Sequence, residues 1–319
     1  MNKLILDMDV GIDDAMALAF VLASPEAELL GITGTFGNVA MTTSVRNSLR
    51  LLECFDRTEI PVYLGSTHAL QKEGCYYPDQ TTQDIHGADG VGNIGLSEPV
   101  IKAQTEDAID YLIRMIRTYQ KELVIVPTGP LANIARVFQK APETAAMVGR
   151  IVLMGGTFML PGNITPFAEA NIGNDPEAAK IVFESGAPLT LVGLDVTHRT
   201  LLRKEDVAKW RQLGTENGRN FADMVDFYLK IYEKNAPQLK GCPIHDPLAT
   251  MVALYPDLVT TLESKTTVIT EGVQRGRTIM DPAKLNQKDG KTKIALNVDE
   301  KRADQLFKSR LTRILKAGE

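Results

Sequence analysis

The sequence predicts an α/β fold, with a mostly parallel, Rossmann-like sheet that is covered by helices on both faces. Short apolar runs alternate with longer segments whose apolar residues recur at helical spacing, which is typical of parallel strands joined by crossover helices. Polar residues also gather where the apolar runs end, at the edge where open α/β sheets bind ligands. The chain shows no linker and no internal repeat, so residues 1–319 are predicted to form a single domain.

The first unit sets the pattern for the rest of the chain. The apolar run Leu4–Leu6 predicts a buried strand, Gly11 supplies a sharp turn, and Ala15–Ala23 predicts the helix that follows. Apolar or β-branched runs bounded by turn residues predict further strands at Leu29–Thr35, Ile60–Leu64, Leu123–Val126, Ile151–Met154, Leu189–Val192, 266–270, 277–280 and 293–297. Helical stripes predict helices at Thr43–Phe55, Glu106–Tyr119, Leu131–Phe138, Pro176–Glu184, 203–213, 217–234, Leu248–Leu254 and 299–316. The remaining long polar stretches, about 65–103 and 155–175, are predicted to be loops, and loops of that length are usually functional or mobile.

Composition excludes several classes of partner. The chain is 44% hydrophobic and 24% charged, with a net charge of −5 and no basic run, so neither nucleic acid nor an acidic membrane is expected as a partner. The three cysteines are widely spaced and are typical of free thiols in a reducing compartment. The N-terminus runs directly into the first strand, without a signal-peptide pattern. A cytoplasmic protein is therefore expected.

The strongest chemical signal is the acidic segment after the first strand. Asp7, Asp9, Asp13 and Asp14 fall within eight residues, and such a group repels itself unless a cation holds it. Carboxylate oxygens at a strand end suit Ca²⁺ or Mg²⁺. Taken singly, Asp13 and Asp14 are more simply explained as acids in the first turn of a helix, and Asp7 as a solvated strand end; the group of four together favours a cation site.

Two other sites offer oxygen ligands. Asp246, in His245-Asp246-Pro247, adds a carboxylate at a loop–helix junction, although Asp-Pro often only begins a helix. The backbone carbonyl of Thr128 ends a predicted strand and is a candidate neutral ligand. Because Ca²⁺ takes 6–8 oxygens, three carboxylates and one carbonyl would leave positions for water and substrate hydroxyls.

The predicted loop 155–175 carries side chains suited to a polyhydroxyl ligand. Asn163, Glu169, Asn171 and Asn174 lie close together in sequence, and each can pair with a hydroxyl. The alternative is a surface loop in which asparagines form turns. His86 and His245, two of only four histidines, lie in candidate loops and are suited to proton transfer, although a loop histidine is often simply solvated.

These segments together resemble the inosine-uridine-preferring nucleoside hydrolase family. The similar blocks stand in family order: DMDVGIDDA at 7–15, GN at 37–38, IHGADGVG at 85–92, PTGPLANIA at 127–135, MGG at 154–156, GNITPFAEANIGNDPEAA at 162–179, GLDVT at 193–197 and HDPLA at 245–249. The resemblance spans residues 3 to about 280. The chain departs from the family at Val10, where proline is usual, and at Ala170, where an aromatic residue is common.

The resemblance implies hydrolysis of the N-glycosidic bond of ribonucleosides to free base and ribose. Ca²⁺ would be held by Asp9, Asp14, Asp246 and the Thr128 carbonyl, and Asp9 would accept a proton from the water that Ca²⁺ holds. His245 would protonate the leaving base. The remaining residues would bind substrate: Asp13 and Asn171 at the 2′-hydroxyl, Asp246 at the 3′-hydroxyl, Asn163 and Glu169 at the 5′-hydroxyl, Asn38 beside the ribose, and His86, Tyr228 and Tyr232 at the base. The family also suggests a homodimer or homotetramer.

Two alternatives remain open. Asp7-Met8-Asp9 after a strand also resembles the nucleophile segment of Mg²⁺-dependent haloacid-dehalogenase-type phosphatases, but that chemistry leaves Asp13 and Asp14 unexplained. The other alternative is a non-catalytic nucleoside- or sugar-binding protein on the same fold. Base preference is not readable from the sequence, because His245 suits purines while the family includes pyrimidine-preferring members.

Overall fold

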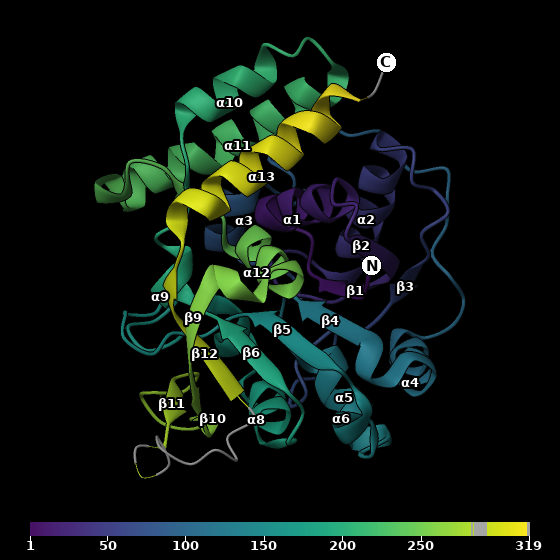
Figure 1. Cartoon of the computed structure of the whole chain (residues 1–319), viewed down its shortest axis with the longest axis vertical. Coiled ribbons are helices and arrows are strands. Elements are labelled where there is room, and N and C mark those ends of the chain that lie inside the picture. Colours follow the sequence, from purple (N-terminus) through teal and green to yellow (C-terminus); the bar gives the residue numbers. More distant parts are fainter. Residues whose placement is uncertain (282, 284–291, 318–319) are drawn as a thin grey trace.

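The computed structural model describes residues 1–281, 283 and 292–317 and is built on one eight-stranded sheet (Figure 1). Across the sheet the strand order is β3-β2-β1-β4-β5-β6-β12-β9. The strands are β1 (Asn2–Met8), β2 (Ala27–Gly34), β3 (Val62–Leu64), β4 (Leu123–Pro127), β5 (Arg150–Met154), β6 (Leu189–Val192), β9 (Val259–Ser264) and β12 (Thr292–Val298). All neighbouring pairs are parallel except β12 with β9. The predicted mostly parallel α/β fold is confirmed.

The strand order creates a crevice at a defined point of the sheet. From β1 the chain moves outward to β2 and β3, then returns to the other side of β1 as β4 and continues outward to β6. Loops that follow β1 and β4 therefore diverge to opposite sides, and ligands of open α/β sheets bind in the gap between them. Asp9 follows β1 and Thr128 follows β4, so the predicted site residues flank this gap.

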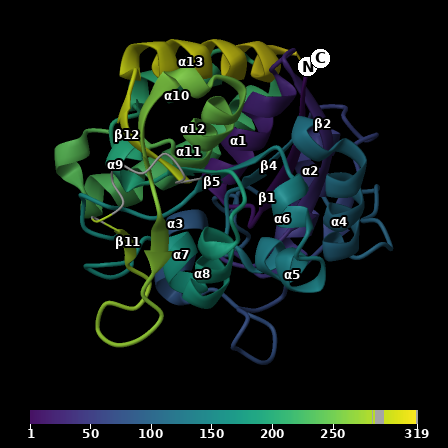
Figure 2. The same cartoon turned by 60° about the horizontal axis from the view of Figure 1, so that its bottom comes forward.

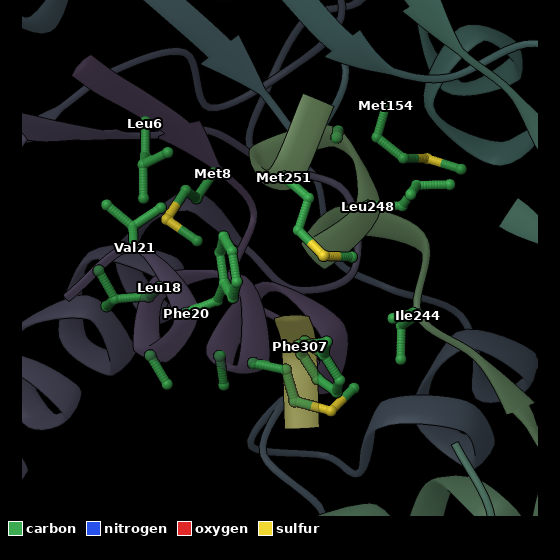
Figure 3. Close-up of a cluster of buried hydrophobic side chains, with 14 of the residues drawn as sticks. Leu6, Met8, Leu18, Phe20, Val21, Met154, Ile244, Leu248, Met251 and Phe307 are labelled. Carbon is green, nitrogen blue, oxygen red and sulfur yellow. The ribbon is translucent and has the colours of Figure 1, made fainter. Parts of the chain in front are cut away.

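Alternate residues of the strands supply two separate cores. On β1, Leu4, Leu6 and Met8 face one core while Ile5 faces the other. The same alternation recurs along β4 and β5, as expected of strands buried on both faces. Figure 3 shows the first core, where Leu6 and Met8 lie beside Phe20 of α1.

Helices on each face complete these cores. One face carries α1 (Ile12–Leu22), α2 (Met41–Cys54), α11 (Glu216–Asn235), α12 (His245–Leu254) and α13 (Glu300–Lys316). The other face carries α4 (Ala108–Tyr119), α5 (Ala132–Lys140), α6 (Thr144–Met147) and α8 (Pro176–Glu184). Figure 2 shows α13 and α5 on opposite sides of β1 and β4. Further elements are α10 (Lys204–Arg211), the short helix α9 (Leu194–Thr197), and two small antiparallel sheets of two strands each, β7 (Leu201–Leu202) with β8 (Cys242–Pro243) and β10 (Thr266–Val268) with β11 (Thr278–Met280).

Among the sequence-based elements that the structure corrects are two loops, one helix start and one strand. The predicted loop 65–103 contains α3 (Gln80–His86), and the predicted loop 155–175 contains α7 (Ala170–Asn174). The predicted helix Leu248–Leu254 begins three residues earlier, at His245. Strand β9 was not predicted, because only Val259 and Ser264 of its six residues are buried and the apolar alternation is weak.

Over the ranges that the structure describes, none of the helices is both long and apolar enough to cross a membrane.

Candidate active site

A cavity of about 510 Å³ opens at the gap between the β1 and β4 loops. It has an acidic floor, an aromatic wall and a loop wall. The residues predicted for substrate binding gather here: Asp13, Asn38, His86, Asn163, Glu169, Asn171, Tyr228, Tyr232 and Asp246 all line the cavity, together with Thr128 and His245. The sequence therefore identified side chains from seven separate segments that the fold brings to one place.

Three carboxylates form the floor. One oxygen each from Asp13, Asp14 and Asp246 lies within 4.8 Å of the other two, and these three form an acidic group suited to a metal ion. Asp13 and Asp14 stand in the first turn of α1, and Asp246 stands in the first turn of α12. Since α1 and α12 pack against each other, two helix N-termini are brought together with their acidic side chains. The positive ends of both helix dipoles partly offset the negative charge.

Hydrogen bonds fix the orientation of Asp14. Its Oδ1 accepts from the Thr128 hydroxyl at 2.6 Å, and its Oδ2 accepts from the Gly11 N–H at 2.9 Å and from Asn38 Nδ2 at 3.2 Å. These donors come from the loops after β4, β1 and β2. The carboxylate is thus fully buried yet held by three segments.

Asp9 lies beside this floor but outside the group of three. Its Oδ2 accepts from the Asn38 N–H at 2.7 Å and its Oδ1 accepts from Asn38 Nδ2 at 3.4 Å, so Asn38 bridges Asp9 and Asp14. A Cβ at Gly37, whose φ is +152°, would overlap Asp9 Oδ2, and one at Gly129 would crowd Asp9 Cγ. Glycine at both positions is therefore what leaves room for this carboxylate.

The acids strongly perturb one another. Burial, followed by the charge of Asp14, raises the pKa of Asp13 to about 7 and holds the pKa of Asp9 well above its usual range. Burial and the charge of Asp13 raise the pKa of Asp246 in the same direction. Two oxygens of the group, Asp13 Oδ1 and Asp246 Oδ2, are buried without a hydrogen-bond partner. Unpaired buried oxygens in a group of carboxylates fit a bound cation, which would satisfy them and restore ionised acids.

A further buried carboxylate, Asp7, links the strands next to the floor. Asp7 Oδ1 accepts from the Thr33 hydroxyl at 2.6 Å and from Asn133 Nδ2 at 2.7 Å. Asn133 also donates to the Gly34 carbonyl and accepts from the Ser66 N–H, so Asp7 ties β1 to the ends of β2 and β3 and to α5. Burial raises the pKa of Asp7 to about 6.

The loop wall uses its polar side chains to hold itself together. Glu169 caps α7: its Oε1 accepts from the Asn171 N–H at 2.9 Å, and its Oε2 accepts from the Gly156 and Ile172 N–H groups at 2.9 and 3.2 Å. Asn171 Nδ2 donates to the Thr128 carbonyl at 2.8 Å and to the Met154 carbonyl at 3.1 Å. The Asn171 amide therefore holds the proposed carbonyl ligand, while its Oδ1 remains for a ligand.

The aromatic wall is a chain of hydrogen-bonded side chains. The Tyr228 and Tyr232 hydroxyls lie 3.4 Å apart, Tyr232 lies 3.0 Å from His245 Nε2, and His245 Nδ1 lies 2.8 Å from the Thr197 hydroxyl. Burial lowers the pKa of His245 well below its usual range, and it raises the pKa of Tyr232. His245 is thus a neutral imidazole near pH 7.

His86 lies on the other side of Tyr228, with the two ring centroids 5.6 Å apart. Its Nδ1 accepts from the Ile12 N–H at 3.2 Å, which places the ring proton on Nε2. Burial lowers the pKa of His86 to about 3. A neutral, hydrogen-bonded His86 beside Tyr228 fits a ligand-contacting role better than that of a proton donor.

Sequence reasoning missed several cavity residues. His198 lies with its ring centroid 5.7 Å from that of His245, and its position next to the GLDVT segment was the available signal. No comparable signal marks the cavity residues on α3, at the end of α11 and just after it. These are Thr82, Ile85, Asn235, Gln238 and Leu239. Trp210 is fully buried against Phe307, away from the cavity lining.

The fold and the site together define an α/β enzyme with a metal-binding carboxylate floor and a neighbouring wall for an aromatic ligand. A family model for the inosine-uridine preferring nucleoside hydrolases matches residues 4–305. The chain belongs to this family. The Mg²⁺-phosphatase alternative is excluded, and the predicted enzyme class, a hydrolase of ribonucleoside N-glycosidic bonds, is confirmed.

Relatives cover the chain almost completely. The pyrimidine-specific ribonucleoside hydrolase RihA of Enterobacter sp. (strain 638) is 36% identical over 97% of each chain. Among solved structures, a purine-preferring ribonucleoside hydrolase from Gardnerella vaginalis has a TM-score of 0.96 and 46% identity, covering 98% of this chain and 99% of that one. A plant nucleoside hydrolase has a TM-score of 0.91 and 35% identity over the same shares.

The Asp7 environment yields a prediction with a defined sign. The folded-state pKa of about 6 lies above the value of about 3.9 for an unfolded chain, so the carboxyl favours folding at low pH and this contribution is lost as the pH rises through 6. Relative to wild type, Asp7→Asn should therefore gain roughly 2.5 kcal/mol of unfolding free energy between about pH 4 and pH 8, at 1.36 kcal/mol per pKa unit.

Urea denaturation in the presence of chelator measures this difference at each pH. Asp84→Asn, at an exposed carboxylate on α3, is the matched control for the exchange of aspartate for asparagine. A pH-independent difference between Asp7→Asn and wild type would contradict the assignment.

Proposed function

We propose that the cavity cleaves ribonucleosides with Asp9 as the general base, a Ca²⁺ ion on the acidic floor, and His245 as the source of the proton for the leaving base. The observation that carries the proposal is the buried acidic group with two unpaired oxygens beside an aromatic wall. Ribose offers a vicinal diol to the floor, and a nucleobase offers a flat ring to the wall. A non-catalytic binding protein would need contacts with the ribose diol and with the nucleobase. It would not need a buried carboxylate, such as Asp9, beside them to accept a proton.

Asp9, Asp14, Asp246 and the Thr128 carbonyl are the proposed Ca²⁺ ligands. All four donors are hard oxygens, and neither sulfur nor imidazole stands among them, which favours Ca²⁺ or Mg²⁺ over zinc. Asp13 lies in the acidic group with Asp14 and Asp246, and it is a further candidate carboxylate ligand. When bound, the cation lowers the pKa of water and fixes the ribose hydroxyls.

The ribose is oriented by side chains that face the cavity on either side of the floor. Asp13 and Asn171 Oδ1 can accept from the 2′-hydroxyl, and Asp246 Oδ2 can accept from the 3′-hydroxyl. Asn163 and Glu169 lie at the loop wall, on the side proposed for the 5′-carbon, and Asn38 braces the ribose through its contacts with Asp9 and Asp14. This orientation turns C1′ toward Asp9 and the base toward Tyr228.

Asp9 is the proposed acceptor of the proton of the attacking water. Its carboxylate is buried beside the acidic floor, and Asn38 donates to both of its oxygens. Because the acidic floor is anionic, it also stabilises the positive charge that develops on the ribose in an oxocarbenium-like transition state.

The leaving base needs a proton on its nitrogen. His245 is neutral and carries one ring proton, and Tyr232 lies within hydrogen-bond distance of its Nε2. His245, through Tyr232 or directly, is the proposed donor, and His86 and Tyr228 are proposed to contact the base ring.

Several properties remain proposals at the level of the family. We infer a homodimer or homotetramer, a cytoplasmic location and a single domain over 1–319. One relative is named pyrimidine-specific and another purine-preferring, so both classes of base are candidate leaving groups.

Ca²⁺ should bind and stabilise the protein through the acidic floor. At a concentration of 100 times Kd, a single site gives about 2.7 kcal/mol of stabilisation, which thermal unfolding with and without Ca²⁺ detects. Asp14→Asn removes the charge with little change in shape and should abolish this gain, while Asp84→Asn should keep it. Equal stabilisation of Asp14→Asn and wild type would contradict the site.

Asn171→Ala should weaken catalysis and selectivity together. It removes the amide that holds the Thr128 carbonyl and the acceptor for the 2′-hydroxyl, at roughly 1–3 kcal/mol for a buried polar contact. Steady-state kinetics should show a lower kcat/KM for ribonucleosides and a smaller preference over 2′-deoxyribonucleosides. Asn220→Ala on α11 is the matched control. Unchanged discrimination in Asn171→Ala would place the 2′-hydroxyl elsewhere.

His245→Ala separates an acid from a residue that only shapes the floor. Removing a positioned acid costs about 10²–10⁴ in rate, so the variant should be slow on inosine. It should cleave p-nitrophenyl riboside at near the wild-type rate, because that leaving group departs as a stable anion. Equal losses on both substrates would mean that His245 acts through neighbouring Asp246.

A further inference from the structure

The loop wall of the cavity differs from the floor and the aromatic wall in how its polar atoms are used. The floor leaves Asp13 Oδ1 and Asp246 Oδ2 unpaired, whereas the loop wall pairs its own groups. Glu169 accepts three backbone N–H groups with its two oxygens, and Asn163 Oδ1 accepts from the Ala170 N–H at 2.9 Å. The loop wall therefore does not depend on a substrate group to complete its hydrogen bonds.

This difference decides what the site rejects. A site rejects an analogue that lacks a hydroxyl by 10⁴–10⁵ when the missing group leaves buried polar atoms unpaired. Here Glu169 stays paired with three N–H groups, and Asn163 is exposed, so water satisfies its free Nδ2. Loss of a 5′-hydroxyl would leave no buried orphan at the loop wall.

The surface around these groups is apolar and open. Ala170 presents no side chain beyond Cβ, and Ile164 is 49% exposed although it lines the cavity. An apolar substituent at the 5′-carbon would cover Ile164 and lie beside the small side chain of Ala170. A 5′-phosphate would instead approach Glu169 and the aspartates of the floor, which repel an anion.

We propose that this enzyme also hydrolyses ribonucleosides whose 5′-hydroxyl is replaced by an apolar group, with 5′-alkylthio ribonucleosides as the substrate class and Ala170 as the residue that admits them. The inference rests on the proposed function, since it uses the orientation of the ribose on the acidic floor.

The chemistry at C1′ is that of the parent reaction. Water forms the new C1′–O bond, the C1′–N bond breaks with its electron pair going to the base, and one proton of the water is delivered to the base nitrogen. The products are free base and a 5-alkylthio ribose, and the 5′ C–S bond is untouched. No oxidant, reductant or further co-reactant is needed.

The test compares matched substrates on the metal-loaded enzyme. Release of free base is measured for inosine and uridine, for their 5′-deoxy and 5′-methylthio analogues, and for their 5′-monophosphates. For the better parent, kcat/KM of the 5′-deoxy and 5′-methylthio analogues should stay within about thirtyfold of the parent, with the monophosphate far slower. A larger loss for the 5′-methylthio analogue, or cleavage of the monophosphate as fast as that analogue, would overturn the proposal. No cleavage of either parent would instead overturn the proposed function.

Ala170→Phe tests the place of the substituent. A phenyl ring would fill the loop wall, so the ratio of kcat/KM for the 5′-methylthio analogue to that for the parent should fall at least tenfold. Ala170→Ser, which adds one atom, is the matched control and should keep the ratio. The ratio is the readout because general damage to the fold or to the metal site slows both substrates alike. An unchanged ratio in an active Ala170→Phe enzyme would show that the 5′ substituent does not lie at this wall.

Discussion

Mutual repulsion among buried carboxylates is the constraint on which the site depends. Oxygens of Asp13, Asp14 and Asp246 lie within 4.8 Å of one another, and at an effective dielectric constant of about 20 two unit charges at that separation repel by roughly 3–4 kcal/mol. The protein meets this cost with donors to Asp14 from three loops and with two helix N-termini aimed at the group. Asp13 Oδ1 and Asp246 Oδ2 are left without donors. The arrangement therefore fits a bound cation, which would satisfy these oxygens and offset the repulsion.

The topology makes such a group possible without long-range strain. Asp9 to Asp14 occupy the turn from β1 into α1, and Thr128 stands at the end of the neighbouring strand β4, where the strand order reverses. The loop after β2 reaches over through Asn38, and α12 delivers Asp246 because it packs on α1. Each segment contributes one or two polar groups from the end of a rigid element. The two hydrophobic cores on either side of the sheet fix the positions of these elements, and therefore of the polar groups at their ends.

Local signals explain what could be predicted from the sequence. Apolar runs such as Leu4–Leu6 and the acidic turn that follows each span only a few residues. Such local patterns were enough to predict the strand, the helix and the candidate acidic floor. Helix α3 was not, because among Gln80–His86 only His86 is buried and its N-terminus depends on a cap from Asp79. The role of Glu169 was also unreadable in full: a carboxylate that caps a helix and one that binds a hydroxyl have the same sequence signature, and only the three N–H contacts distinguish them. The spacing of the aspartates in the sequence likewise does not reveal which of them meet in space. Asp13, and not Asp9, joins Asp14 and Asp246 in the acidic group.

The two histidines of the cavity, His86 and His245, differ in the hydrogen bonds that their ring nitrogens make. Burial keeps His86 and His245 neutral, so neither ring holds a spare proton in the free enzyme. His86 already accepts from the Ile12 N–H, whereas His245 lies between two hydroxyls, Thr197 and Tyr232, each of which can donate or accept. These two hydroxyls hold the His245 ring in place and let either nitrogen carry its one proton. In the proposed reaction a proton that His245 gives to the base must be returned to the ring, and the reaction frees one when Asp9 deprotonates the attacking water. His86 lacks this choice of tautomer, because its Nδ1 is already occupied by the Ile12 N–H.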